Sequence, residues 1–361
     1  MKNLSREENS QRSKSASSIG EGPIETLPRL LLKDVTTPVK DDLKVLYRQF
    51  RKMLKSGIFL VDEVSSYLIK SRGKGLRPTL TLLAARSCGV QGPLPERTLI
   101  AGLVVEMLHT ATLVHDDVVD KADERRGMPT LSFVFNNKVA VLFGDYMLAR
   151  SMQGMLAQRS LDVLDLFSDC AIRLAEGELV EAVKARRLDL TKEDYFRMVG
   201  DKTASLISAA CQMGPLSLDL GDEFRKPLGD YGELVGVAFQ IRDDLLDLGD
   251  GSQKLGKPIG LDLGQAKLTL PLIHALEGVS LSDKKQILTK LRKAKRLGKK
   301  GKSLDLSDVI NLIKEQHGIE YSRDIALDYA RKASEALDDI PQNLFRDHLK
   351  RFAYYAAERN K

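Results

Sequence analysis

The sequence predicts an all-α protein, and two features of the chain predict it. Successive segments from Val39 to Lys361 place apolar residues at the i, i+3, i+4 and i+7 spacing of a helix that packs one face on a core. No segment shows sustained alternation of apolar and polar residues rich in Val, Ile and Thr, so no strand is predicted. Clusters of Gly, Pro and Asp separate the helical segments.

The apolar spacing defines the helices in order. In the first, Leu43, Leu46, Phe50 and Leu54 follow the i, i+3, i+7, i+11 pattern. Pro78 is predicted at the first position of the third helix. The predicted helices cover residues 39–54, 60–70, 79–88, 96–121, 131–158, 161–185, 192–214, 222–248 and 264–278, then a basic helix from 282 that leads into an exposed loop by 303, and three helices within 305–361.

The chain is predicted to hold one domain. No linker or repeat of solenoid period divides residues 39–361, which form a single helical domain. Residues 1–38 are predicted to be a disordered or loosely ordered tail. The first part of this tail, 1–23, is rich in Ser, Lys and Glu and has almost no large apolar residue.

The composition excludes several classes of protein. The net charge of +6 is modest, and no basic run is interleaved with aromatic residues, so nucleic acid is not a predicted partner. Cys88, Cys170 and Cys211 are odd in number and lack a CxxC spacing, which indicates reduced thiols in the cytoplasm. No apolar run reaches the roughly 18 residues of a membrane span. The basic segment 284–302 favours a solvated helix face, with an acidic membrane surface as the alternative.

An acidic cluster follows an apolar helix at Asp116, Asp117 and Asp120. On a helix the residues i and i+4 share a face, so Asp116 and Asp120 point the same way and repel each other. The cluster therefore predicts a cation between them, and Mg²⁺ prefers such oxygen ligands together with phosphate.

A second acidic cluster repeats this spacing about 125 residues later, at Asp243, Asp244 and Asp247. One such cluster is most simply a solvated helix face, but two on apolar helices are hard to explain in that way. Two facing clusters would form a chamber for several Mg²⁺ ions, whose natural guest is a diphosphate.

Basic residues accompany both clusters, and each one alone is more often a surface charge than a ligand. Arg suits bidentate contacts with phosphate, and Lys supplies a point charge. His109, two helical turns before Asp116, would alone be a core histidine, but it could donate to a second phosphate group. The candidate basic residues are Lys74, Arg77, Arg125, Arg126, Lys202, Lys257 and Lys267.

These motifs resemble the trans-prenyltransferases, the polyprenyl diphosphate synthase family, over nearly the whole chain from Val39 to Lys361. The matching pieces are GKGLRP, EMLHTATLVHDDVVDKADERRG, GDYMLAR, GDKTASLI, AFQIRDDLLD, GKPIGLDL and KLTLPLI. The resemblance implies an isoprenoid-synthase bundle of antiparallel helices around a deep central cavity, acting as a homodimer. It also implies head-to-tail condensation of isopentenyl diphosphate onto an allylic diphosphate, with about three Mg²⁺ ions per active site.

The resemblance assigns roles residue by residue. Asp116, Asp120 and Asp243 would be direct Mg²⁺ ligands, supported by Asp117, Asp244 and Asp247. The allylic diphosphate would be held by Arg125, Lys202 and Lys267, with Thr203, Gln240 and Lys257 nearby. Isopentenyl diphosphate would be held by Lys74, Arg77, His109 and Arg126. The catalytic set is thus Asp116, Asp117, Asp120, Arg125, Lys202, Asp243 and Asp244.

The chain departs from the family pattern at a few positions. Arg72 and Gly75 stand where members often have a glycine and an arginine, Lys121 replaces a third acidic residue, and GQAK replaces a glycine-lysine ending. None of these positions is assigned a direct role. A membrane surface, in weak contact with the protein during product release, is a further candidate partner.

The implied reaction explains the predicted layout. Breaking the allylic C–O bond releases a diphosphate, which metal ions and basic residues stabilise, and leaves a carbocation that must be kept from water. The cavity below the metals should therefore be apolar, and its depth should set the product length. Ala111 and Thr112, five and four residues before Asp116, are small where short-chain members often have aromatic residues.

The small residues favour a product longer than C15, of at least C20 and with a medium-to-long chain. The alternative is that Ala111 and Thr112 are small only because the helix packs closely there, and that a deeper residue closes the cavity. Replacing Ala111 by Phe should shorten the product. The alternatives are a short-chain farnesyl or geranylgeranyl diphosphate synthase and a non-catalytic partner subunit. The intact aspartate motifs argue against a silent subunit. The candidate isopentenyl diphosphate site argues against a terpene cyclase, and a helical scaffold would leave the paired motifs unexplained.

Overall fold

The computed structural model describes residues 32–71, 73–250, 260–298 and 300–360. In this part of the chain the protein is almost entirely helical, as predicted. The elements, in order, are α1 (Leu32–Thr36), η1 (Thr37–Val39), α2 (Lys40–Leu54), α3 (Phe59–Ser71), α4 (Leu76–Ser87), α5 (Glu96–Val119), β1 (Glu124–Arg125), β2 (Met128–Pro129), α6 (Leu131–Phe135), α7 (Asn137–Leu156), α8 (Leu161–Arg187), α9 (Lys192–Val199), the π-helical turn η2 (Gly200–Ala204), α10 (Ser205–Leu216), α11 (Asp222–Asp247), α12 (Leu261–Gly264), α13 (Leu270–Glu277), α14 (Leu281–Gly298), α15 (Ser307–Glu315), α16 (Gly318–Ala336) and α17 (Leu344–Glu358).

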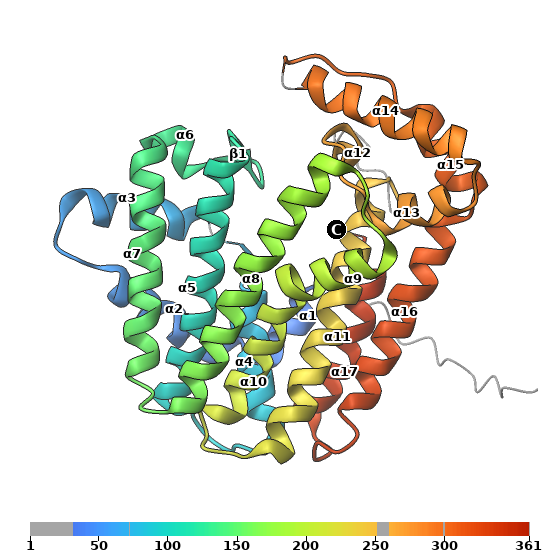
Figure 1. The fold of residues 1–361 in the computed structure, drawn as a ribbon. Helices are drawn as coiled ribbons and strands as arrows, with labels where there is room; N and C mark the ends of the chain where they lie inside the picture. The colour runs from blue at the N-terminus through green and yellow to red at the C-terminus, as the bar shows by residue number, and fades with distance from the viewer. Residues whose placement is uncertain (1–31, 72, 251–259, 299, 361) are drawn as a thin grey trace, which may run out of the picture.

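The long helices form a bundle around α5, α10 and α11 (Figure 1). Helix α5 packs against α4, α7 and α10, while α11 packs against α10, α16 and α17. Apolar residues surround α5 on most sides, so the helix is buried rather than amphipathic. By length and composition α5 could also cross a membrane, but most of its candidate span is buried inside the bundle.

Two predicted helices are interrupted. The segment 131–158 forms α6 and α7, which meet at Asn136 with a φ of +76°. The Asn136 side chain accepts a hydrogen bond from the Val139 N–H at 3.1 Å and so caps α7. The segment 192–214 forms α9 and α10 with the π-helical turn between them. Such turns change the direction of a helix and often mark functional sites.

Other predictions need correction at element ends. Pro78 is the third residue of α4, not the first, because the helix begins at Leu76 after Gly75, whose φ is +62°. The segment 264–278 does not begin a helix at Gly264. Helix α12 ends there, and α13 starts at Leu270, with Pro271 in its first turn. The short antiparallel pair of β1 and β2 was not predicted.

The helical body begins before the predicted boundary at Val39. Residues 32–36 form α1, and Val35 and Val39 are each only 1% exposed in the core. Residues 1–31, the rest of the predicted tail, lie outside the described residues.

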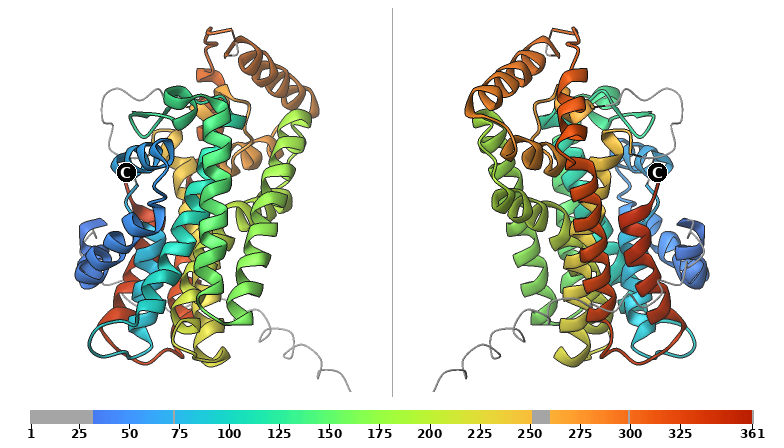
Figure 2. Two further views of the ribbon diagram at one scale, coloured as in Figure 1. Left: turned by 90° about the vertical axis from the view of Figure 1, so that its left-hand side faces the viewer. Right: turned by 90° about the vertical axis from the view of Figure 1, so that its right-hand side faces the viewer.

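One end of the bundle gathers the functional motifs. The carboxyl ends of α5 and α11, the β1–β2 hairpin, α12 and α14 all lie at this end, as the two side views also show (Figure 2). We refer to it as the motif end.

Candidate active site

The first aspartate motif occupies the carboxyl end of α5. Asp117 is buried, Asp116 is partly buried, and Asp120 is the exposed residue that ends the helix. Burial and the nearby Glu178 raise the pKa of Asp116 to about 6, with a smaller contribution from Asp120. The repulsion predicted from the i, i+4 spacing is therefore present, and an acidic residue of α8 adds to it.

The second aspartate motif lies at the carboxyl end of α11. Asp244 is buried, and it accepts hydrogen bonds from Tyr195 Oη at 2.6 Å and from Gln240 Nε2 at 2.9 Å. Burial raises the pKa of Asp244 to about 8 although both hydrogen bonds oppose the shift. Asp243 pairs with Arg359 at 2.6 Å, and the Asp247 carboxylate accepts the Asp262 N–H at 3.0 Å.

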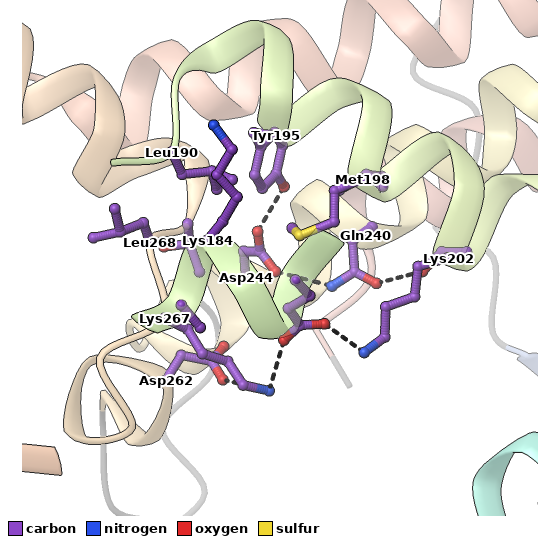
Figure 3. A pocket seen from close by; sticks show the side chains of 15 residues that line it. Lys184, Leu190, Tyr195, Met198, Lys202, Gln240, Asp244, Asp262, Lys267 and Leu268 are labelled. Carbon is purple, nitrogen blue, oxygen red and sulfur yellow. Dashed lines mark hydrogen bonds and ion pairs between the residues drawn. The ribbon is translucent and has the colours of Figure 1, made fainter. Parts of the chain in front are cut away.

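A pocket beside the second motif contains three lysines, and we call it the lysine pocket (Figure 3). Glu181 of α8 pairs with Lys202 at 2.5 Å and with Lys267 at 3.7 Å. Lys267 also lies 3.9 Å from Asp262. The residues that line it include Glu181, Lys184, Tyr195, Lys202, Thr203, Gln240, Asp244, Asp262 and Lys267.

The π-helical turn places Lys202 and Thr203 in this pocket. Thr203 Oγ1 donates to Gln240 Oε1 at 2.9 Å, and Gln240 in turn donates to Asp244. The turn fits between α8 and α11 only because both helices carry a glycine there. A Cβ on Gly177 would lie 2.9 Å from the Lys202 nitrogen, and a Cβ on Gly236 would lie 2.3 Å from Ala204 Cα.

Lys202 connects the lysine pocket electrostatically with the first aspartate motif. Its ammonium group pairs with Glu178 at 2.8 Å as well as with Glu181. Burial opposes its charge, but the two glutamates outweigh burial and raise the pKa of Lys202. The charges of Lys202 and Glu178 both reach Asp116 of the first motif. One end of the bundle therefore holds both motifs around a shared set of charges.

A second pocket lies beside the first motif, and we call it the arginine pocket. It is lined by the β1–β2 hairpin, the loop before α4 and the face of α5 that carries His109. Arg125 Nε donates to Asp117 Oδ1 at 2.6 Å. The residues that line it include Gly73, Glu106, His109, Asp117, Arg125 and Arg126.

Positive charge is in excess around this pocket. Burial, followed by the charges of Arg77, Arg126 and Arg125, holds the pKa of His109 well below its usual range. Burial lowers the pKa of Arg77 to about 10 in spite of the attraction of Glu106, and Arg126 lowers it further. The buried Arg77 Nε has no hydrogen-bond partner among the described residues. An anion bound here would satisfy that donor and relieve the repulsion.

The hairpin separates the two neighbouring arginines. Arg125 belongs to β1 and pairs with Met128, whereas Arg126 and Gly127 form the two-residue turn with φ values of +56° and +77°. Positive φ at both central residues is typical of the type I′ hairpin turn. Arg125 therefore reaches back to α5, while the guanidinium of Arg126 packs against Gly73.

The structure brings part of the predicted site residues to the two pockets. The predicted residues that line one of them are His109, Asp117, Arg125, Arg126, Lys202, Thr203, Gln240, Asp244 and Lys267. Asp116, Asp120, Asp243 and Arg77 line neither pocket. Lys74 is exposed in the loop before α4, and Lys257 lies outside the described residues. Thr112 is partly buried on the Asp116 face of α5, one turn from it, while Ala111 is fully buried about 140° round the helix. Neither Ala111 nor Thr112 lines the lysine or the arginine pocket.

The acidic groups suit divalent cations in their chemistry. Carboxylates are the ligands that Mg²⁺ prefers, and the raised pKa values of Asp116 and Asp244 indicate negative charge that a cation would stabilise. Among the residues described, no three acidic, histidine or cysteine side chains converge into a complete ion site. A bound phosphate would have to supply the missing ligands.

Four residues of the site were not predicted. Glu178 and Glu181 lie three residues apart on α8, and that spacing on one helix face was the available signal. Asp262 lies in the matching piece GKPIGLDL, but no role was predicted for it. Burial raises the pKa of Asp262 to about 6, helped by Asp247. Nothing in the sequence marked Tyr195, whose partner is 49 residues away.

Comparison with known proteins agrees with this geometry. The family model described as polyprenyl synthetase matches residues 59–305. Octaprenyl diphosphate synthase of Escherichia coli is 34% identical over 330 residues, which cover 91% of this chain and 99% of the relative.

Solved structures give the same result. A decaprenyl diphosphate synthase from Rhodobacter capsulatus has a TM-score of 0.81 and 34% identity, covering 92% of this chain and 100% of the other. A polyprenyl synthase from Caulobacter crescentus, complexed with calcium and isoprenyl diphosphate, has a TM-score of 0.82 and 29% identity, covering 93% and 100%. The chain therefore belongs to the polyprenyl synthetase family and is a trans-prenyltransferase.

Proposed function

We propose that this protein condenses isopentenyl diphosphate head to tail with an allylic diphosphate, depends on Mg²⁺, and makes a medium-to-long-chain polyprenyl diphosphate. The observation that supports this most directly is the pairing of two aspartate motifs with two separate cationic pockets. Two diphosphate substrates need two such sites, and a single-substrate enzyme needs one.

The residues divide between the two substrates. The lysine pocket, with Lys202, Lys267 and Thr203, suits the allylic diphosphate, since it lies beside the second motif and its charges reach the first. The arginine pocket, with its excess of positive charge, suits isopentenyl diphosphate. Arg125 lines the arginine pocket, and its ion pair with Asp117 keeps it beside the first motif.

Bound Mg²⁺ would supply positive charge to the diphosphate as it leaves. Asp116, Asp120 and Asp243 would hold it, with Asp117, Asp244 and Asp247 behind them. Lys202 and Lys267, now paired with Glu181, can pair with phosphate oxygens instead. In this way the chain presents preorganised charge to the developing anion.

The direct test is an assay with labelled isopentenyl diphosphate, Mg²⁺ and allylic primers of several lengths. We expect a product longer than C20 with at least one primer. A product of C15 or C20 would favour the short-chain alternative. If product forms only when a second protein is added, the result would favour the non-catalytic subunit. The intact aspartate motifs and the hydrogen bonds that Tyr195 and Gln240 donate to Asp244 argue against that alternative.

Product length is proposed to depend on the level of Ala111 and Thr112. The octaprenyl name of the Escherichia coli relative supports a long product. Ala111→Phe and Thr112→Phe place a large ring at the same level on two sides of α5, and we expect a shorter product. Since a Phe in a buried position can cost roughly 1–3 kcal/mol of stability, thermal unfolding of each variant is measured first. Folded variants with an unchanged product distribution would contradict this assignment.

We further propose that the protein works as a homodimer in the cytoplasm. Helices α7 and α8 follow each other in the chain and touch, and they expose Leu142, Met152, Ile172 and Leu179 at more than half of their surface. A large exposed apolar face is typical of an interface between subunits. Three free cysteines fit a reducing compartment.

A further inference from the structure

Helix α14 presents a strongly basic face to solvent. Its inner side is apolar, since Leu291 is 0% and Ala294 3% exposed. The opposite side carries cations at helical spacing, namely Lys285, Arg292, Lys293 and Arg296, all of them exposed. No acidic residue interrupts this side, because the acidic residue of the helix, Asp283, lies in the first turn and accepts a hydrogen bond from Ser280 Oγ.

Three of these four cations have no acidic partner among the described residues. Lys285, Lys293 and Arg296 make no ion pair with a carboxylate of the described residues. Lys290, on the flank of the helix, is already paired with Asp308. Lys300 and Lys302 follow in the exposed loop and extend the same charge. Unpaired charges held this close together repel one another, and an anionic surface would reduce that repulsion.

Two contacts place this face at the rim of the lysine pocket. Arg292 Nη2 donates to the Arg187 carbonyl at 3.0 Å, at the end of α8, and Arg186 and Arg187 are exposed there. Helix α14 also packs on α12, which carries the pocket residue Asp262. Figure 2 shows α14 projecting across the motif end of the bundle.

Apolar side chains are exposed beside the cations. Leu281, the first residue of α14, is 87% exposed, and Leu261 of α12 is 46% exposed. Basic residues next to exposed leucines are typical of a surface that meets anionic lipid headgroups and inserts shallowly between them. The face has no aromatic residue on which a nucleic-acid base could stack.

We infer that the exposed face of α14, with the end of α8, docks the protein on an anionic phospholipid bilayer and turns the motif end toward it. Only the benefit of this docking, the transfer of product to the bilayer, rests on the proposed function. A product with a long apolar tail and a diphosphate head can pass from the motif end to the bilayer without crossing water. The docking itself rests on the charges and contacts of α14.

Vesicle flotation of the full chain tests this inference without substrate. Vesicles containing phosphatidylglycerol are compared with vesicles of phosphatidylcholine alone. We expect binding to the anionic vesicles only, weakening as salt is raised through the range that screens surface charge. Each cation near an anionic surface contributes about fivefold to the affinity. The triple variant with Lys285→Gln, Lys293→Gln and Arg296→Gln should therefore bind the anionic vesicles on the order of 100-fold more weakly.

A matched control removes the same charge elsewhere. Arg48→Gln, Arg51→Gln and Lys52→Gln change three exposed cations of α2, which lies away from α14 in Figure 1. The control should bind anionic vesicles like the unaltered protein. Both triple variants should keep their thermal unfolding and their activity in detergent, so that loss of docking is distinct from loss of the proposed reaction.

Four results would overturn the inference. The unaltered protein could ignore anionic vesicles, both triple variants could lose binding equally, or a single-stranded RNA could bind in an α14-dependent way while vesicles do not. Inorganic diphosphate at the concentration of the lipid headgroups serves as a competitor. If inorganic diphosphate releases the protein completely from the vesicles, the exposed face of α14 binds free phosphate groups and not a bilayer.

Discussion

Tyr195 shows at the scale of one residue how a buried contact can support a metal-binding motif. Its hydroxyl donates to Asp244 at 2.6 Å and favours the ionised carboxylate, which burial disfavours. Tyr195→Phe removes that donor, and a hydrogen bond to a charged group contributes about 1.5–3 kcal/mol. We expect kcat/KM to fall roughly tenfold and the Mg²⁺ concentration for half-maximal activity to rise.

The matched control is Tyr231→Phe, since Tyr231 is equally buried but donates to the Leu349 carbonyl outside the two pockets. It should lose stability and keep its Mg²⁺ dependence. Equal Mg²⁺ dependence of the two variants would show that Tyr195 has a packing role only.

Gly73 sets the position of Arg126 in the arginine pocket. A Cβ at this position would lie 1.9 Å from Arg126 Nη1, so Gly73→Ala must displace the guanidinium. We expect KM for isopentenyl diphosphate to rise several-fold, while KM for the allylic substrate stays the same. Gly298→Ala is the control, because a Cβ there meets nothing within 4 Å. A rise in the allylic KM alone would reverse the assignment of the two pockets.

At the scale of elements, Arg242 connects α11 to the carboxyl end of α17. Its buried guanidinium donates to the Arg359 carbonyl at 2.6 Å and pairs with Asp250 at 2.5 Å, and Asp250 also pairs with Arg323 of α16. Asp250→Asn would leave Arg242 buried without its carboxylate. We expect the free energy of unfolding to fall by roughly 1.5–3 kcal/mol at neutral pH, measured by urea denaturation.

The same ion pairs predict a pH dependence. Burial opposes the charge of Asp250, but hydrogen bonds from Arg323 and Arg242 outweigh burial and hold its pKa below the ordinary 3.8. A lowered folded-state pKa contributes stability above the unfolded value, and that contribution is lost as the pH falls through the folded value. The difference between the protein and Asp250→Asn should therefore be constant above about pH 5 and shrink below pH 4.

The exposed pair of Asp328 with Arg331 and Lys332 provides the control. Asp328→Asn should change stability by at most about 0.5 kcal/mol, since exposed pairs contribute little. A loss as large as that of Asp250→Asn would show that burial is not what makes the Arg242 network matter.

At the scale of the molecule, the apolar face of α7 and α8 predicts association. Leu179 and Ile172 lie seven residues apart on α8 and are 67% and 54% exposed. Light scattering should give about twice the 40.1 kDa of one chain. Leu179→Glu together with Ile172→Glu should give the mass of one chain, because a charge is costly in a dry interface. Leu344→Glu, on the exposed start of α17, should leave the mass unchanged.

Much of the fold could be predicted because helices leave a local signal. The apolar spacing placed α2, α8 and α11 within a few residues of their observed ends, and it gave the three helices α15, α16 and α17 without their bounds. The errors fall where one side chain decides, as at Asn136, or where a residue of low helix preference still lies inside a helix, as Pro78 does in α4. The apolar spacing is a property of many residues together, so it does not reveal the effect of a single side chain.

The sequence by itself determined the aspartate motifs, since their chemistry is a local spacing on one helix. Only the tertiary structure decided what surrounds them. Glu178 beside Asp116, Tyr195 on Asp244 and Glu181 between two lysines all join segments that are distant along the chain. The reason is physical: repulsion within one helical turn can be inferred from the spacing of residues, whereas burial and the charges of other helices exist only once the bundle has formed.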